Sequence, residues 1–335
     1  MVQHITIQAF LAQHLQGEHA VALSAMLDDV ATAVKKIAIA VDNGALTGNM
    51  GSLASENVQG EVQKALDVIS NDIFIEAGLQ SGYVAGMVSE EMESPFEIAE
   101  KQRANGQYLL LFDPLDGSSN VNVNISVGTI FSILKSPGNH PELADFLQPG
   151  AAQICAGYAL YGTSTMLVFT VGNGVNGFTL DVDSGKFCLT HPGMQIAAET
   201  QEFAINMSNY RFWQAPVQRY IDECLQGEEG DRKKDFNMRW VASMVAEVHR
   251  ILVRGGVFMY PQDTKSKAGK LRLMYEANPM SFIVEQAGGA ATTGVQRILE
   301  VKPSGIHQRV PVMMGCRSEI ERLITYHQTK SKRKS

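Results

Sequence analysis

The chain has 335 residues, of which 45% are hydrophobic and 19% charged, a composition that excludes a disordered chain or a collagen-like repeat and is typical of a globular protein. At about 150 residues per domain, this length predicts two domains or two halves of one large domain. The 28 Lys and Arg residues against 35 Asp and Glu residues give a net charge of −7, so we expect neither nucleic acid nor a membrane surface as a partner.

The cysteines and the amino terminus indicate the compartment. Four cysteines lie far apart with no C-x-x-C pair, which favours a reducing environment over a zinc site or a disulfide-bonded scaffold. The first 17 residues carry Gln3, His4, Gln8, Gln13 and His14 in place of a basic segment followed by an apolar one, so we expect no signal peptide. No run of about 18 uncharged apolar residues occurs, so we expect no membrane span. These features predict a cytoplasmic protein.

Helical patterns come first along the chain. Apolar residues at steps of three and four predict an amphipathic helix over residues 21–41. Residues 44–60 are rich in Gly, Ser and Asn and predict a loop. Helical spacing returns over residues 62–77, which places Asp67 on a second helix.

Strand patterns follow this helix. Residues 83–88 and 108–112 predict two buried strands, the first ending before Glu90 and Glu91 and the second ending before Asp113. From residue 124 to residue 189, β-formers between glycine turns predict a largely antiparallel sheet. Each of the first two strands therefore stops at carboxylates.

The pattern weakens near residues 194–200, where we place the boundary between an N-terminal half, 1–195, and a C-terminal half, 196–335. The second half opens with residues 202–206. Helices over 216–224 and 241–253 and a strand over 256–260 then predict alternating α and β structure. Asn278 as N-cap and Pro279 at the first helical position predict a helix start, with Glu276 in the preceding turn. The basic residues from 329 onward fit a frayed, solvated end.

Two motifs do not carry function. Gly172, Gly174 and Gly177 spell G-x-G-x-x-G, but the following residues alternate with period two, which predicts a hairpin turn and no dinucleotide site. Cys316 and Arg322 have the spacing of cysteine phosphatases, but no glycine lies between them to free backbone amides for a phosphate.

The densest chemical signal is the segment D-P-L-D-G-S-S-N at residues 113–120. Asp113 and Asp116 lie three residues apart at a strand end and can both face one cation, and hard oxygen ligands select Mg²⁺ or Mn²⁺. Gly117, Ser118 and Ser119 offer backbone amides and hydroxyls to an anion beside the metal, an arrangement suited to phosphoryl chemistry. A surface turn is the alternative, since these residues are turn formers.

With these motifs the chain resembles the class I fructose-1,6-bisphosphatases, within a metal-dependent, lithium-sensitive phosphatase superfamily that includes the inositol monophosphatases. The resemblance covers most of the chain, through residues 88–91, 113–120, 126–131, 243–250, 269–276 and 278–293. The inositol phosphatases share the first two motifs only loosely, so the sugar bisphosphatase match is the more specific. It implies an α/β fold in layers α-β-α-β-α with two mixed or antiparallel sheets. It also implies Mg²⁺-dependent hydrolysis of D-fructose 1,6-bisphosphate to D-fructose 6-phosphate and phosphate, a step of gluconeogenesis.

The resemblance also assigns roles to residues. Asp67 and Glu91 would help to deprotonate the attacking water. Two or three divalent cations, Mg²⁺ or Mn²⁺, would be held by Glu90, Asp113, the Leu115 carbonyl, Asp116 and Glu276. The sugar and its two phosphates would contact Asp116, Gly117, Ser118, Ser119, Asn206, Tyr210, Arg239, Tyr260 and Lys270. In the family Arg239 reaches across a subunit interface, which implies a homo-oligomer, most simply a homotetramer. The neighbouring Lys265 and Lys267 fit a solvated loop.

Two departures from the family pattern matter. Trp240 stands where the family usually has a tyrosine, which keeps hydrolysis of sedoheptulose 1,7-bisphosphate open as an alternative.

Many relatives bind inhibitory adenosine monophosphate at a G-T-G-E-L-T segment, whereas residues 19–24 here read H-A-V-A-L-S. At the two positions where those relatives have basic residues that contact the nucleotide, this chain has Gln107 and Lys135. This difference predicts weak inhibition by that nucleotide. A non-catalytic sugar-phosphate sensor is an alternative of another class, disfavoured by the complete set of carboxylates.

Overall fold

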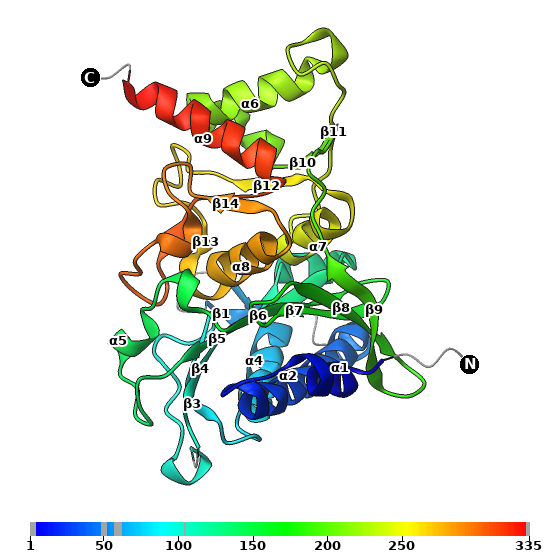
Figure 1. The fold of residues 1–335 in the computed structure, drawn as a ribbon, viewed down its shortest axis with the longest axis vertical. Helices are drawn as coiled ribbons and strands as arrows, with labels where there is room; N and C mark the ends of the chain where they lie inside the picture. Colours follow the sequence, from blue (N-terminus) through cyan, green and yellow to red (C-terminus); the bar gives the residue numbers. More distant parts are fainter. Residues whose placement is uncertain (1–4, 48–51, 57–61, 104, 333–335) are drawn as a thin grey trace.

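The structure is a computed structural model that describes residues 5–47, 52–56, 62–103 and 105–332. Figure 1 shows five layers stacked along the long axis, with helices below, between and above two sheets. This arrangement confirms the layered α-β-α-β-α class that the motifs indicated. The elements that form each layer are given below in order.

The first helical layer covers the outer face of the larger sheet and contains α1 (Ile7–His14), α2 (Ala20–Asp42), the short α3 (Gly44–Thr47) and α4 (Ala65–Gly78). The seven-stranded sheet contains, in spatial order, β3 (Val84–Ser89), β4 (Tyr108–Asp116), β5 (Val127–Lys135), β6 (Cys155–Tyr161), β7 (Thr165–Thr170), β8 (Val175–Asp181) and β9 (Lys186–Met194). Only the pair β3 and β4 is parallel; the other neighbours are antiparallel. The antiparallel sheet predicted over residues 124–189 is therefore confirmed.

The middle helical layer contains α7 (Met244–Arg254) and α8 (Asn278–Gln286). The second sheet has the order β11 (Asn237–Met238), β10 (Glu202–Ala204), β12 (Val257–Tyr260), β16 (Val312–Gly315) and β14 (Ala290–Thr292). The outer layer contains α6 (Ala215–Leu225) and α9 (Arg317–Lys332).

Smaller elements connect these layers. They are the strand pair β1 (Ser52–Glu56) and β2 (Val62–Lys64), the pair β13 (Leu271–Arg272) and β15 (Arg309–Val310), the helix α5 (Leu143–Phe146), the π-helical turn Leu273–Ala277, and 3₁₀ turns at Glu100–Gln102, Ser118–Val123, Gly150–Ala152, Met207–Phe212, Gly227–Glu229 and Ile298–Glu300.

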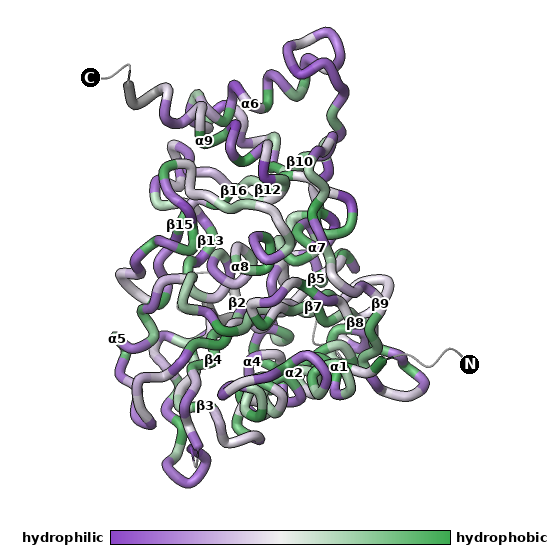
Figure 2. The backbone as a smooth tube through the Cα atoms, viewed as in Figure 1, coloured by the Kyte–Doolittle hydropathy of each residue, from purple (hydrophilic) through white to green (hydrophobic). Residues whose placement is uncertain are grey.

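Three hydrophobic clusters fill the spaces between the layers. One lies under α2 and α4, one lies between α6, α9 and the second sheet, and the largest surrounds α7 and α8 between the two sheets. Figure 2 shows the same pattern, with hydrophobic segments inside and hydrophilic loops at the two ends of the long axis. In the largest cluster Tyr158 of β6 and Val245 of α7 share one core, so residues before and after position 195 pack together. The division of the chain at that position stays a prediction.

The predicted first helix is confirmed as α2, whose apolar stripe buries Leu27, Val34 and Ile37 completely. The loop predicted over 44–60 is wrong where the structure describes it, because α3 and β1 form there; residues 48–51 and 57–60 lie outside the described residues. The helix predicted from residue 62 begins only at Ala65, because Val62–Lys64 pairs with β1 as a strand. A partner strand distant in sequence overrides the local helical spacing.

Three further boundaries differ from the predictions. The strand expected to end before Asp113 continues to Asp116, with an irregularity where Pro114 has no N–H to donate. Ala277, not Asn278, is the N-cap of α8, because the π-helical turn leads directly into the helix. The basic end is helical to Lys332 instead of frayed; residues 333–335 lie outside the described part. The hairpin predicted at Gly172–Gly177 is confirmed between β7 and β8.

Candidate active site

A polar cavity of about 540 Å³ opens where the two sheets face each other across the middle helices. The lining residues come from the ends of β3, β4 and β12, from the starts of α4 and α7, from residues 270–276 and from the segments around Asn206 and Trp240. They are Asp67, Glu90, Glu91, Asp113, Leu115, Asp116, Gly117, Ser118, Ser119, Asn206, Trp240, Ala242, Ser243, Met244, Phe258, Tyr260, Lys270, Leu271, Arg272 and Glu276. The cavity therefore brings together thirteen of the fifteen residues predicted for the site from the sequence, all but Tyr210 and Arg239.

Three carboxylates meet at the base of this cavity. Single oxygens of Asp113, Asp116 and Glu276 lie within 4.8 Å of one another, and all three side chains are buried. Burial raises the pKa of Asp113 well above its usual range, and repulsion from Glu90, Asp116 and Glu276 raises that pKa further. Burial and the charge of Glu90 likewise raise the pKa of Glu276. Such a cluster is suited to a divalent cation, which would remove the repulsion.

Hydrogen bonds fix Asp116 in this cluster. Its Oδ2 accepts from Ser243 Oγ at 2.8 Å and from the Val245 N–H at 3.0 Å, and these bonds partly offset the rise that burial causes in the pKa of Asp116. Ser243 is also the N-cap of α7, where its Oγ accepts from the Ala246 N–H at 3.3 Å. The start of α7 thus holds a carboxylate that belongs to β4.

The turn after β4 is fixed from two sides. The Leu115 N–H donates to Asp113 Oδ1 at 3.0 Å, and Thr129 Oγ1 donates to the Pro114 carbonyl at 2.8 Å. Gly117 has φ +75°, and a Cβ there would lie 2.8 Å from the Ser243 Cβ, so glycine is required by both conformation and space. The backbone of residues 117–119 consequently passes close against the start of α7 at the edge of the cavity.

Asp67 lies in the first turn of α4 and is also held from the backbone. Its Oδ2 accepts from the Lys64 N–H at 2.9 Å, as in a capping box. The Lys64 ammonium donates to the Ser118 carbonyl at 2.5 Å, which joins α4 to the turn after β4. The side chain of Asp67 is buried at the cavity wall.

Arg272 is the most important residue that the sequence interpretation missed. Its Nη2 lies 3.3 Å from Glu90 Oε1, and its backbone N–H donates to Glu276 Oε2 at 2.6 Å. With Lys270 it supplies the two cations of the lining, against six carboxylates. A signal was present in the spacing K-x-R-x-x-x-E of residues 270–276, but only its first and last members received a role.

An aromatic wall forms the other side of the cavity. The Trp240 ring stacks on Phe258 with centroids 6.2 Å apart and an interplanar angle of 4°, and its centroid lies 5.9 Å from that of Tyr260. The Lys270 ammonium donates to Tyr260 Oη at 3.2 Å. Asn206 begins a 3₁₀ turn, where its Oδ1 accepts from Ser208. This wall offers one cation, one phenol and flat apolar faces.

Two predicted site residues lie elsewhere in the chain. Tyr210 Oη donates to Asp222 Oδ1 of α6 at 2.6 Å, and Arg239 is half exposed with its Nε 3.9 Å from Glu202 Oε1. Neither residue lines the cavity described above.

Comparison with known proteins places this architecture among sugar phosphatases. Residues 5–192 match the family model "Fructose-1-6-bisphosphatase, N-terminal domain", and residues 196–328 match "Fructose-1-6-bisphosphatase, C-terminal domain". The chain is 62% identical over 327 residues to the class 1 fructose-1,6-bisphosphatase of Methylobacillus flagellatus, covering 96% of this chain and 98% of the relative. The relative of the same name from Halorhodospira halophila is 62% identical over 310 residues, or 90% of this chain and 91% of its own.

Solved structures agree with the sequence comparison. The holo form of Leishmania major fructose-1,6-bisphosphatase superposes with a TM-score of 0.91 at 37% identity, covering 97% of this chain and 99% of that chain. The chain therefore belongs to the fructose-1,6-bisphosphatase family, class 1. This confirms the family and the bisphosphatase activity predicted from the motifs. No helix in the described residues is long and apolar enough to cross a membrane.

Proposed function

We propose that the chain hydrolyses D-fructose 1,6-bisphosphate to D-fructose 6-phosphate and phosphate in gluconeogenesis, with Mg²⁺ as its cofactor and Mn²⁺ as a substitute. The observation that carries this proposal is the meeting of Asp113, Asp116 and Glu276 in one buried cluster at the base of a polar cavity. The same cavity is lined by residues 117–119 and by Lys270. A substrate with two phosphates can thus be held at both ends.

The lining fits divalent cations. Six carboxylates against two basic side chains leave a large excess of negative charge in a partly buried space, which hard cations neutralise best. We propose that two or three cations are held by Glu90, Asp113, the Leu115 carbonyl, Asp116 and Glu276. When bound, they supply Lewis-acid polarisation of the phosphate and activation of the attacking water.

The protein groups then position the phosphate and take up the proton. Asp67, held by the Lys64 N–H, and Glu91 accept the proton of the attacking water. Backbone amides and hydroxyls of residues 117–119 bind the phosphate that is removed. Water attacks phosphorus in line with the departing sugar oxygen, so no covalent bond to the enzyme forms.

The aromatic wall binds the sugar and its second phosphate. Lys270 supplies a point charge to that phosphate beside the Tyr260 hydroxyl, and Asn206 contacts the sugar. Arg239 is exposed and therefore accessible to a neighbouring copy, which fits its proposed place in the cavity of a partner subunit in a homotetramer. Tyr210 would first have to release Asp222 in order to contact the substrate.

Trp240 is the reason to test a second sugar bisphosphate as substrate. Its flat ring forms part of the wall where the second phosphate is proposed to bind, and an indole N–H donates without accepting. Hydrolysis of sedoheptulose 1,7-bisphosphate, alone or in addition, is therefore the second candidate. A non-catalytic sensor is disfavoured, because it has no need for Asp67 and Glu91 beside the three clustered carboxylates.

Phosphate release tests the proposal on the purified chain. We expect release from fructose 1,6-bisphosphate that depends on Mg²⁺, a smaller kcat/KM for sedoheptulose 1,7-bisphosphate, and inhibition by lithium. A cytoplasmic location agrees with the four cysteines, all of which are free thiols. Size-exclusion chromatography with light scattering checks the tetramer. Binding of the sugar without any Mg²⁺-dependent release would favour the sensor instead.

A further inference from the structure

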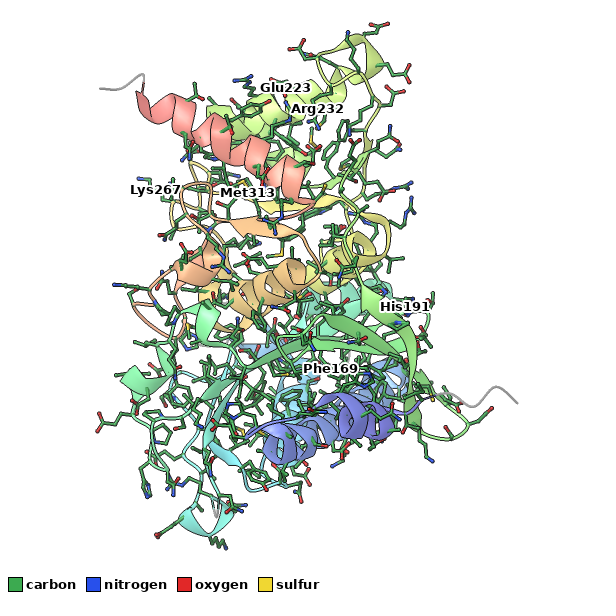
Figure 3. All side chains as sticks on the ribbon, in the orientation of Figure 1. Phe169, His191, Glu223, Arg232, Lys267 and Met313 are labelled. Carbon is green, nitrogen blue, oxygen red and sulfur yellow. The ribbon has the colours of Figure 1, made fainter. Side chains whose placement is uncertain are left out.

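The segment of residues 260–270 borders two cavities. Tyr260 and Lys270 at its ends line the candidate active site, whereas Pro261, Gln262 and Lys267 line a second cavity of about 250 Å³. Figure 3 labels Lys267 at the outer edge of the C-terminal half and Met313, which lines the same cavity, further inside and close to α9. One continuous segment of the chain therefore lines both the second cavity and the candidate active site.

The second cavity is positively charged. Lys267 and His327 line it, and among the described residues no Asp or Glu does so. In the part of the chain that the structure describes, the Lys267 ammonium has no hydrogen bond or ion pair. A cation without a counterion, beside a hollow free of carboxylates, attracts an anion.

Glutamine residues add hydrogen-bonding groups to this cavity. Gln214, Gln262, Gln296 and Gln308 all line it. The Oε1 of Gln308 accepts from the Ser304 N–H at 2.6 Å and from Ser304 Oγ at 2.9 Å, which leaves its amide NH₂ to donate. Primary amides both donate to and accept from hydroxyl groups. Four of them around one small hollow suit a hydroxylated compound.

The end of the segment is packed tightly against this cavity. Gly269 has φ +85°, and a Cβ there would lie 2.1 Å from the Val310 carbonyl carbon, so the segment presses on backbone that forms the cavity wall. The next residue is Lys270, which donates to Tyr260 in the candidate active site. A ligand bound at Lys267 would therefore act on the position of Lys270.

We propose that this second cavity binds a small hydroxylated anion, a phosphorylated or carboxylated compound of about three to six carbons, and that binding there changes the affinity for substrate. Lys267 contacts the anionic group, and the glutamine amides contact the hydroxyls. The effect on substrate rests on the proposed function, because Lys270 is assigned there to the second phosphate. The binding itself does not depend on that assignment.

Titration calorimetry on the full metal-free chain tests the binding, with glycerol 3-phosphate and glycerate as the two probes. We expect saturable binding that weakens at least tenfold in Lys267→Ala. Lys265→Ala is the matched control, because its ammonium lies 3.9 Å from the Phe212 ring centroid and does not line the cavity. Binding should persist in Lys270→Ala. The tighter of the two probes identifies phosphate or carboxylate as the anionic group.

Kinetics test the second half of the proposal. The tighter probe should change KM for the substrate at least twofold in the parent chain and in Lys265→Ala, but not in Lys267→Ala. Absence of saturable binding by both probes would overturn the proposal, as would binding that Lys270→Ala abolishes and Lys267→Ala leaves intact. A chain that binds the probe but releases no phosphate would instead refute the proposed function.

Discussion

His249 of α7 links the stability of the fold to pH. Its Nδ1 lies 2.8 Å from Tyr158 Oη of β6, and its ring centroid lies 6.3 Å from that of His191 in β9. Burial and the neighbouring His191 lower the pKa of His249 from the ordinary 6.5 to about 4. Between these values the unfolded chain binds a proton that the folded chain excludes, so stability falls as the pH falls from 6.5 to about 4.

The size of this loss follows from the two pKa values. Between about pH 7.5 and about pH 4.5, His249 should remove about 2.5 kcal/mol from the free energy of unfolding. His249→Gln keeps a hydrogen-bonding group beside Tyr158 and cannot titrate, so it should lose less stability over the same range. Urea unfolding at a series of pH values, at one protein concentration, gives the difference between the two curves.

The exposed His140 provides the control, because His140→Gln changes an imidazole that stays in water in both states. Its curve should run parallel to that of the parent chain. If the stability curve of His249→Gln also ran parallel to that of the parent chain, the reasoning would be refuted. That result would mean that the His249 ring binds its proton as readily in the folded chain as in the unfolded one.

Three further predictions concern activity. Asp113→Asn removes one charge from a buried, repelling cluster, so phosphate release should fall by about two orders of magnitude or more while urea unfolding of the metal-free chain shows no loss of stability. Asp67→Ala and Glu91→Gln should lower kcat more than they raise KM; an effect on KM alone would make them substrate binders. Adenosine monophosphate should inhibit poorly, because Lys135, the basic residue that remains at the partner positions named above, already contacts Glu18 at 3.0 Å; cooperative inhibition at micromolar concentrations would contradict this.

The sequence was informative where local chemistry decides structure. The spacing of apolar residues defines α2, and D-P-L-D-G-S-S-N marks the turn whose carboxylates meet in the cavity. Local sequence did not predict structure that depends on a partner distant in the chain. The pairing of Val62–Lys64 depends on β1, and the extension of β4 to Asp116 depends on its pairing with Gly128 of β5. The spacing of residues 270–276 could have marked Arg272 as a site residue, but it could not name Glu90 as its partner, because the two residues are distant in the sequence.

The order of its three residues in the sequence determines when the cluster at the base of the cavity can be complete during synthesis. Asp113 and Asp116 belong to the first sheet, whereas Glu276 belongs to the π-helical turn before α8. The ribosome therefore releases the first two carboxylates well before the third, and Ser243, which holds Asp116, also comes late. A nascent chain that ends before residue 276 therefore lacks the third carboxylate of the cluster. On the function proposed above, phosphate release requires synthesis to continue past Glu276.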